Sequence, residues 1–423
     1  MTASLPAMAG TPLSLTEAID RALVYNFAIK SAVQDSAAAA FAYAGTNAER
    51  FPSLTLDARS RFVDQLPALQ LPSGTKEIGS KDSYQADISL TVPLYTGGRL
   101  SNRIGLEREN VFIQQAQLDA RRLAVAYRSR NAYLNLMASQ VTAKAADASL
   151  ERLRIINQDV NALYENGLAD SLDLLESALA LEKGRHMLDQ AQLGLHNASC
   201  ALAQAIGASL QDEMEPTEPL PAPVPPDSLR GYATERIDRP ELKAQDHVIS
   251  AAQRAAAVQT GGYAPSVSGF AGYSYGMPNQ DWFNKTWNDY FSGGVMLKWE
   301  LNLGGKTGRG VQAAKMRALS ARLAKEELED SFRLQRDLAV NALRHAYRAY
   351  LISEREYAMA QRQYNLARLR QQEGRLSVNR LLEMEADLNA AEQRHRGSIV
   401  DYYLALNDYL YALGSPKIFG GLL

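Results

Sequence analysis

The chain is a tandem duplication, and its two copies keep one register over half of the protein. Three landmarks recur 207 residues apart: Gly97-Gly98-Arg99 with Gly304-Gly305-Lys306, Gly167 with Gly374, and Gly207 with Gly414. Upstream the offset becomes 213, because Phe51-Pro52-Ser53-Leu54 corresponds to Ala264-Pro265-Ser266-Val267. Solenoid repeats have periods of about 20 to 50 residues, so this period indicates a duplicated half-domain. We expect internal two-fold pseudo-symmetry, with one loop of six additional residues in the first copy.

Each copy contains a long block without proline. Proline is absent between Leu94 and Glu215 and between Asn279 and Ser415. Because proline breaks helices and these blocks are rich in good helix formers, each block predicts long helices. One glycine tip interrupts each block, with Ser171 or Ser377 as a candidate cap of the following helix. The blocks therefore predict two helical hairpins, with long arms at 99–165 and 306–372 and return arms at 170–206 and 377–413.

These helices are expected to pack as coiled coils. The long arms would be about 100 Å in length at 1.5 Å per residue. Apolar residues on the first hairpin are spaced three and four residues apart, which is the heptad pattern. They are Leu188, Ala191, Leu195, Ala198, Leu202 and Ala205 on the return arm, and Leu134, Met137, Val141, Ala145 and Ala148 on the long arm. The many alanines indicate close helix approach.

Two alternating segments precede each long arm and predict strands at 51–62, 84–96, 264–275 and 290–303. Phe270 interrupts the alternation of the third. Ten or more residues, with aromatic residues near the ends, are typical of tilted strands that cross a bilayer. The charged residues of the polar face would then line a water-filled lumen: Asp57, Arg59, Arg61, Asp87, Lys298 and Glu300. A water-soluble sheet with one wet face is the alternative.

Four strands cannot close a barrel, so the strands of one chain require partners from other copies. Three copies would supply 12 strands, which is within the range of outer-membrane barrels. The sequence contains no run of 18 apolar residues, so it predicts no transmembrane helix. The sequence thus favours a mainly α fold, with duplicated coiled-coil hairpins and four strands per chain that are shared in a trimeric barrel.

The composition excludes several classes of function. With a net charge of −2, the chain has no overall positive charge that would attract nucleic acid. The single cysteine, Cys200, rules out an internal disulfide framework, and the five histidines are scattered along separate helices. Gly305-Lys306-Thr307 and Gly308-Arg309-Gly310 mimic nucleotide-binding motifs but lack the required glycine or βαβ context. We therefore expect no enzyme activity, no cofactor and no metal site.

The domain organisation follows from the duplication. Residues 1–12 are expected to be the remnant of an export signal, because Ala7-Met8-Ala9 fits a cleavage site, or a disordered tail. Residues 13–207 form the first structural repeat and 233–414 the second, each a helix, two strands and a helical hairpin. The proline-rich segment 208–232 connects them, and 415–423 form a C-terminal tail.

Duplication, paired strands, very long helices and glycine-centred tips occur here in the order of one known family. The supporting residues are Leu94-Tyr95-Thr96-Gly97-Gly98-Arg99, Gly167-Leu168 before Asp173-Leu174-Leu175, Gly374 before Leu381-Leu382, and Leu15-Thr16-Glu17-Ala18 with Asn26. From about Leu15 to Gly414 the chain resembles the TolC family of outer membrane factors. The resemblance implies a homotrimer in the lipid of a Gram-negative outer membrane, with its helical part in the periplasm. It also implies an exit duct that works with a periplasmic adaptor (membrane fusion protein) and an inner-membrane transporter.

The resemblance further implies a periplasmic gate and an adaptor-docking surface at the hairpin tips. The positions that match the gate, with their charged neighbours, are Asp173, Glu176, Arg380, Glu383, Asp170 and Arg375. The docking positions are Gly167, Leu168, Ser171, Gly374, Leu376 and Ser377. Arg380 stands where many members carry an acidic residue, so a mixed ring of arginine and glutamate is expected instead of a doubly acidic one.

Three other functions are open at this stage. The same fold serves as the exit of type I protein-secretion systems, and the sequence does not separate that cargo from drugs or other small molecules. A soluble coiled-coil scaffold is a more distant alternative, against which the alternating strands with aromatic ends argue. An enzyme is the least favoured, because no constellation of nucleophile, base and metal ligands is present.

Overall fold

The computed structural model describes residues 11–72, 74–228, 236–280 and 285–421. Most of the expected signal remnant and part of the expected connector lie outside these residues. The chain divides into two compact units. We call residues 34–115 and 243–326 the sheet unit, and residues 1–33, 116–242 and 327–423 the helical unit. The two longest helices contribute residues to both.

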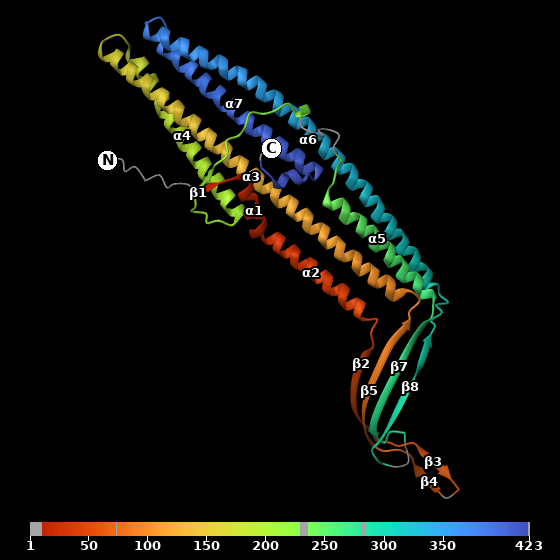
Figure 1. Cartoon of the computed structure of the whole chain (residues 1–423). Helices are drawn as coiled ribbons and strands as arrows, with labels where there is room; N and C mark the ends of the chain where they lie inside the picture. Colours follow the sequence, from red (N-terminus) through yellow and green to blue (C-terminus); the bar gives the residue numbers. More distant parts are fainter. Residues whose placement is uncertain (1–10, 73, 229–235, 281–284, 422–423) are drawn as a thin grey trace. The chain divides into compact units, whose positions relative to one another are not determined.

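The long elements of the two copies follow one order, except that the first copy begins with two helices, where one was predicted, and the second with one (Figure 1). The first contains α1 (Leu15–Tyr25), α2 (Phe27–Ala48), β2 (Ser53–Phe62), β5 (Asp82–Tyr95), α3 (Arg99–Glu165) and α4 (Ser171–Ile206). The second contains α5 (Pro240–Thr260), β7 (Ser266–Met277), β8 (Asn288–Lys298), α6 (Lys306–Gln372) and α7 (Val378–Leu413). Helices α3 and α6 have 67 residues each, and α4 and α7 have 36 each, so the duplication is preserved in the lengths of the helices.

Several short elements were not predicted. A hairpin of β3 (Ala68–Leu71) and β4 (Gly74–Glu77) lies within the connection between β2 and β5, and β1 (Thr11–Leu13) pairs in parallel with β6 (Met214–Pro216). The described residues also contain three short 3₁₀ turns, which are η1 (Pro226–Ser228), η2 (Gly261–Tyr263) and η3 (Pro416–Phe419).

The four long strands form one antiparallel sheet in the order β2-β5-β7-β8. The central pairing of β5 with β7 joins the two copies, and β2 and β8 are the edges. Since side chains alternate between the faces of a strand, the register sorts the apolar and polar positions. Leu56 lies opposite Ile88, which lies opposite Tyr273, on one face. Asp57, opposite Asp87, lies on the other.

Phe270 is the exception that broke the alternation in the sequence. It lies on the polar face of β7, opposite Gly294 of β8. A Cβ atom on Gly294 would lie 3.1 Å from the Phe270 ring, so the glycine makes room for the ring. The aromatic residue is therefore accommodated by a missing side chain on the neighbouring strand.

The fourth strand is shorter than its sequence pattern. The alternation extends to Leu303, whereas β8 ends at Lys298. Beyond the strand, the Trp299 indole donates a hydrogen bond to the Tyr263 carbonyl at 3.2 Å, and the Gly305 N–H donates to the Asn302 carbonyl at 3.0 Å. The backbone turns toward α6 while its apolar residues continue to alternate, which explains the overextended prediction.

Local capping chemistry defines both hairpins. Gly167 and Gly374 at the tips have φ values of +70° and +69°, a left-handed conformation that favours glycine. The Asp170 carboxylate caps α4 by accepting the Asp173 N–H at 2.8 Å, so Ser171 is the first helical residue and not the cap. Ser377 does cap α7, through the Arg380 N–H.

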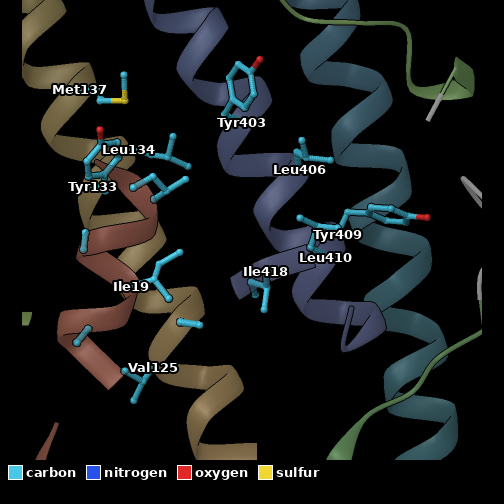
Figure 2. Close-up of a cluster of buried hydrophobic side chains, with 14 of the residues drawn as sticks. Ile19, Val125, Tyr133, Leu134, Met137, Tyr403, Leu406, Tyr409, Leu410 and Ile418 are labelled. Carbon is cyan, nitrogen blue, oxygen red and sulfur yellow. The ribbon is translucent and has the colours of Figure 1, made fainter. Parts of the chain in front are cut away.

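The apolar core of the helical unit joins α1, α3, α4, α6 and α7. Figure 2 shows side chains of α1, α3 and α7 in this core, among them Ile19, Leu134 and Leu406. The connector is held on α7 because Tyr402 and Tyr403 donate hydrogen bonds to the carbonyls of Val224 and Pro221, at 3.0 and 3.2 Å. In the described part of the chain, no helix is both long and apolar enough to cross a membrane.

Candidate functional site

The first candidate site is the polar face of the sheet. The register places five of the six predicted residues on this face: Asp57, Arg59, Arg61, Asp87 and Lys298. The sixth, Glu300, lies two residues beyond the end of β8. The sheet thus gathers most of these charges on one side.

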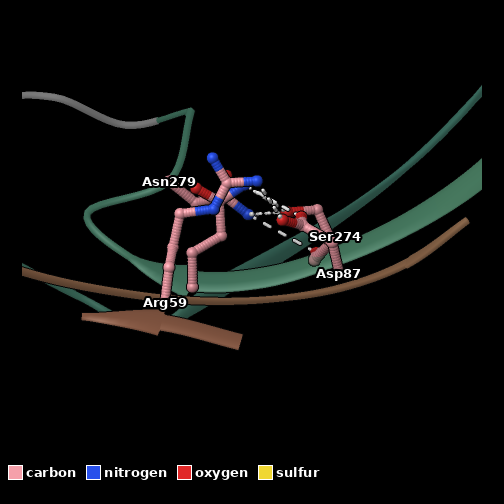
Figure 3. Close-up of polar contacts among 5 residues, drawn as sticks. Arg59, Asp87, Ser274 and Asn279 are labelled. Carbon is pink, nitrogen blue, oxygen red and sulfur yellow. Dashed lines mark hydrogen bonds and ion pairs between the residues drawn. The ribbon is translucent and has the colours of Figure 1, made fainter. Parts of the chain in front are cut away.

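A hydrogen-bond network crosses the polar face (Figure 3). Arg59 donates to Asp87 at 3.2 Å, and Gln85 donates to Asp87 at 2.9 Å and to Ser274 at 3.3 Å. Asn279, in the segment after β7, donates to the Ser274 hydroxyl at 3.4 Å. The network connects β2, β5 and β7 and anchors the start of the next loop to the polar face.

The opposite face of the sheet is apolar and exposed. Leu54, Leu56, Phe291, Val295 and Leu297 are each at least 64% exposed. Trp287 stacks on Tyr84 and Tyr275 near one end of the strands, with ring centroids 6.3 and 5.0 Å apart. An exposed apolar surface of this size, with an aromatic cluster at its margin, is typical of a face that contacts lipid.

The second candidate site is the pair of hairpin tips, where the predicted gate residues make local contacts. Arg380 pairs with Glu383 one turn along α7, and Arg375 pairs with Glu373 at 3.1 Å. Asp170 and Asp173 form the cap of α4, and Glu176 lies on the next turn. Among the described residues, the gate residues of one tip therefore form no ion pair with those of the other.

The two tips differ in their apolar residues. Leu168 in the first tip is 76% exposed. Leu376 in the second packs against a cluster that contains Ile156 and Val160 of α3 and Val378 and Leu381 of α7. One tip thus presents a free leucine, while the other uses its leucine to hold the hairpins together.

A buried ionic cluster that the sequence did not predict links α3 to α7. Glu385 is 3% exposed and accepts hydrogen bonds from Ser149 at 2.7 Å and from Arg152 at 3.2 Å. Arg152 also lies 3.6 Å from Glu392, which pairs with Arg396 at 2.8 Å. Ser149 and Glu385 are separated by 236 residues, so no sequence signal indicated this contact.

Burial dominates the electrostatics of this cluster. It raises the pKa of Glu385 above the ordinary carboxyl value, against the opposing hydrogen bonds from Ser149 and Arg152. A neighbouring cavity of about 470 Å³ is lined by Glu385 together with Glu176, Lys183, Leu153 and Met187. The predicted gate residue Glu176 and the buried Glu385 therefore line one cavity between α3, α4 and α7.

His395 is a half-buried titratable group on α7. Its ring stacks against Tyr350 and Tyr357 of α6, with centroids 5.7 and 5.5 Å away. Burial lowers the pKa of His395, with the Glu354 carboxylate acting in the opposite direction. Its Nδ1 atom is buried without a hydrogen-bond partner in the described structure, so the site favours the neutral ring.

Among the described residues, no group of three or more histidine, cysteine, aspartate or glutamate side chains is placed to hold a metal ion. The two sites instead consist of charged faces, exposed leucines and buried contacts between helices. Such features suit assembly and passage of solutes.

Comparison with known proteins identifies the family. The sequence pattern of the family described as outer membrane efflux protein matches residues 18–208 and 232–412, which lie in the two copies of the duplication. The chain is 32% identical over 143 residues to Protein CyaE of Bordetella pertussis, a match that covers 33% of this chain and 30% of that relative. The chain thus matches less than a third of the length of this curated relative.

Solved structures show the same fold at low sequence identity. The outer membrane protein VceC of Vibrio cholerae has a TM-score of 0.80 and 18% identity, with 97% of each chain covered. The open state of the MtrE outer membrane channel of Neisseria gonorrhoeae has a TM-score of 0.74 and 19% identity, covering 95% of this chain and 88% of that one. The Campylobacter jejuni CmeC outer membrane channel has a TM-score of 0.76 and 18% identity, covering 95% of this chain and 85% of that one.

The chain belongs to the outer membrane efflux protein family. It is an outer membrane channel protein of the Gram-negative type, with its helical part in the periplasm, and not an enzyme. The expected fold class and the resemblance to TolC-like channels are confirmed.

Proposed function

We propose that three copies of this chain form the outer-membrane exit duct of a tripartite efflux pump. The duct passes drugs or other small molecules, delivered by an inner-membrane transporter and a periplasmic adaptor, to the exterior. The observation that carries this proposal is the open four-stranded sheet with one apolar exposed face and one polar face.

The sheet supports the trimer for a geometric reason. In the described chain, β2 and β8 each pair on one side only, and four strands are too few to close around a lumen. Joining β2 of one copy to β8 of the next would give a closed barrel of 12 strands. Its apolar face would contact lipid, and the face that carries Asp57, Arg59, Arg61 and Asp87 would meet water.

The exposed face of α4 supports the trimer independently. Its leucines at 172, 175, 179 and 193 are each at least 57% exposed, on a helix that belongs to the water-exposed periplasmic part. Four large apolar side chains on one helix are costly to leave in water. A neighbouring copy would cover them.

We place the gate and the docking surface at the hairpin tips. Arg380 and Glu383, paired in one chain, would form a ring of mixed charge around the closed end of a trimer, with Asp173, Glu176, Asp170 and Arg375 nearby. The adaptor would bind the small or apolar residues at the tips. These are Gly167, Leu168, Ser171, Gly374, Leu376 and Ser377, among which Leu168 offers the most exposed apolar anchor.

Two measurements test this function. The mass of the detergent-extracted protein from outer-membrane fractions, by light scattering with detergent correction, should be that of a trimer. Expression with its cognate pump and adaptor, in a strain that lacks its own efflux ducts, should restore resistance to small-molecule drugs. A detergent-free monomer or dimer would overturn the duct. Export of a protein, with no change in drug resistance, would instead support a secretion exit.

A further inference from the structure

A cavity lies in the sheet unit where β8 leads into α6. Its volume is about 500 Å³, and its charged and polar lining includes Arg99, Lys298, Glu300, Lys306, Gln259 and Thr307. The lining comes from the first turns of α3 and α6, the ends of α5 and β8, and the residues between strand and helix. The cavity is separate from the hairpin tips and from the network around Asp87.

The cavity has an excess of positive charge. Three cationic side chains line it, and Glu300 is the one carboxylate in its lining. In the described part of the chain, none of these three cations lies within ion-pair distance of a carboxylate. Arg99 donates instead to the Thr96 carbonyl, at 3.1 Å. Three cations that share a cavity with one carboxylate, none of them paired with it, repel one another, so a bound anion would stabilise this corner.

The helix ends increase this excess. Arg99 and Lys306 are the first residues of α3 and α6, and neither helix has an acidic residue in its first turn. The first turn of a helix carries partial positive charge, which favours acidic side chains there and disfavours cations. Both α3 and α6 instead begin with a cation, and both cations lie beside the same cavity. This charge pattern fits an external anion better than it fits the isolated chain.

Glycines and strand contacts give the cavity its shape. A Cβ atom on Gly261 would lie 2.6 Å from Cγ of Arg99, and one on Gly262 would lie 3.2 Å from Cγ2 of Thr307. Side chains at these positions would displace both lining residues. The Ser266 hydroxyl donates to the Lys298 carbonyl at 3.3 Å, and this bond holds the end of β8 beside the cavity.

We propose that this corner cavity binds a phosphate or carboxylate group carried by a solute in the duct. Lysine and arginine donors suit these anions because charge-assisted hydrogen bonds to them are strong. Lys298 and Ser266 are register partners on the polar face of the sheet, so the cavity would open toward the water-filled interior of the trimer. That location rests on the proposed function, whereas the anion preference rests on the cavity itself. Anionic and zwitterionic cargo would thus be retained here before release.

The test is a calorimetric titration of the purified full-length trimer, in neutral detergent at low ionic strength, with inorganic pyrophosphate and with citrate. The double variant Lys298→Gln/Lys306→Gln removes two of the cations, and Glu300→Gln removes the opposing carboxylate. Lys315→Gln is the matched control, because Lys315 is an exposed lysine of α6 outside the cavity lining. A lipid arm measures binding of vesicles of phosphatidylglycerol and of phosphatidylcholine to the same variants.

The expected result is anion binding that weakens about tenfold or more in the double variant, strengthens in Glu300→Gln and is unchanged in Lys315→Gln. Absence of binding, or equal binding by all variants, would overturn the proposal. Dependence on these lysines for phosphatidylglycerol alone would also overturn it, by assigning the cavity to a lipid headgroup. Drug-resistance assays are read separately: anion binding without restored resistance leaves the site standing while the efflux role fails.

Discussion

Helices α4 and α7 are repeat mates of equal length with opposite surroundings. Nineteen of the 36 residues of α7 are buried within the chain, against six of 36 in α4. Val400 and Leu193 occupy equivalent positions, and they are 1% and 61% exposed. The two hairpins thus share a length and differ in role, because α7 packs against other helices of its own chain. Helix α4 instead exposes an apolar surface, which would contact the next copy in the proposed trimer.

The largest expected effect comes from placing a charge at these equivalent positions. Val400→Asp buries a carboxylate without a partner and should destabilise the fold by about 4 kcal/mol or more, enough to prevent accumulation of folded protein. Leu193→Asp should leave the helical fold intact and weaken the trimer. Circular dichroism and light scattering separate the two outcomes. A Leu193→Asp protein that remains trimeric would break the comparison.

The next effect concerns the buried cluster between α3 and α7. Arg152→Ala leaves Glu385 buried without its cation and should cost about 3 kcal/mol of unfolding free energy. The double variant Arg152→Gln/Glu385→Gln should recover much of this loss, because no uncompensated charge remains. Chemical denaturation of both variants measures the difference. If the single and double variants were equally unstable, the packing of the long side chains, and not their charge, would be what matters.

Titration of Glu385 should sharpen the comparison further. Burial raises its folded-state pKa above the ordinary value of 4.5. The stability that Glu385 contributes is therefore fully present below the unfolded pKa and is lost as the pH rises through the folded pKa. Relative to wild type, Glu385→Gln should gain melting temperature as the pH increases above the ordinary carboxyl range. A difference that does not change with pH would contradict the raised pKa.

His395 provides an opposite slope on the same helix. Burial lowers its pKa from the ordinary value of 6.5. Its contribution is present above that value and is lost as the pH falls through the folded pKa. His395→Phe keeps an aromatic ring between Tyr350 and Tyr357, so it should make the protein less sensitive to acid in that window. Melting curves of the variant and wild type across mildly acidic pH measure this effect.

The smallest effect on stability is expected at the tip of α7. Arg380 and Glu383 are both more than half exposed, so Arg380→Ala should change the unfolding free energy by no more than about 0.5 kcal/mol. If these residues form the proposed ring, the same variant should shift the reversal potential of single channels toward cation selectivity. An unchanged reversal potential would contradict a role of Arg380 in the gate.

Local signals in the sequence predicted the periodic parts of the fold. Missing prolines and the tip glycines placed the long arms at 99–165 and 306–372, and α3 and α6 occupy those ranges. Alternation alone misled at Leu303, because a turn can continue an apolar pattern after the strand has ended. The cap of α4 went to Asp170, since its carboxylate lies one residue ahead of Ser171 and reaches the Asp173 N–H.

Contacts between distant segments were beyond sequence reasoning. The parallel pairing of β1 with β6 joins residues about 200 positions apart, and the contacts of Ser149 and Arg152 with Glu385 span more than 230. The identity of a single residue does not indicate which distant residue it contacts. The roles of the tip residues in gating and docking remain predictions, because both roles depend on contacts with other chains.

The open sheet also has a consequence for biogenesis. A chain that has folded but not assembled carries unpaired backbone groups along β2 and β8, beside an apolar face that water cannot solvate well. Exposed edges of this kind recruit any available strand, including those of misaligned copies. The yield of functional duct should therefore depend on how quickly three chains meet at the membrane, and overproduction should favour aggregates over channels. The unassembled subunit is therefore the species most prone to aggregate, and rapid assembly would limit the time it spends in that state.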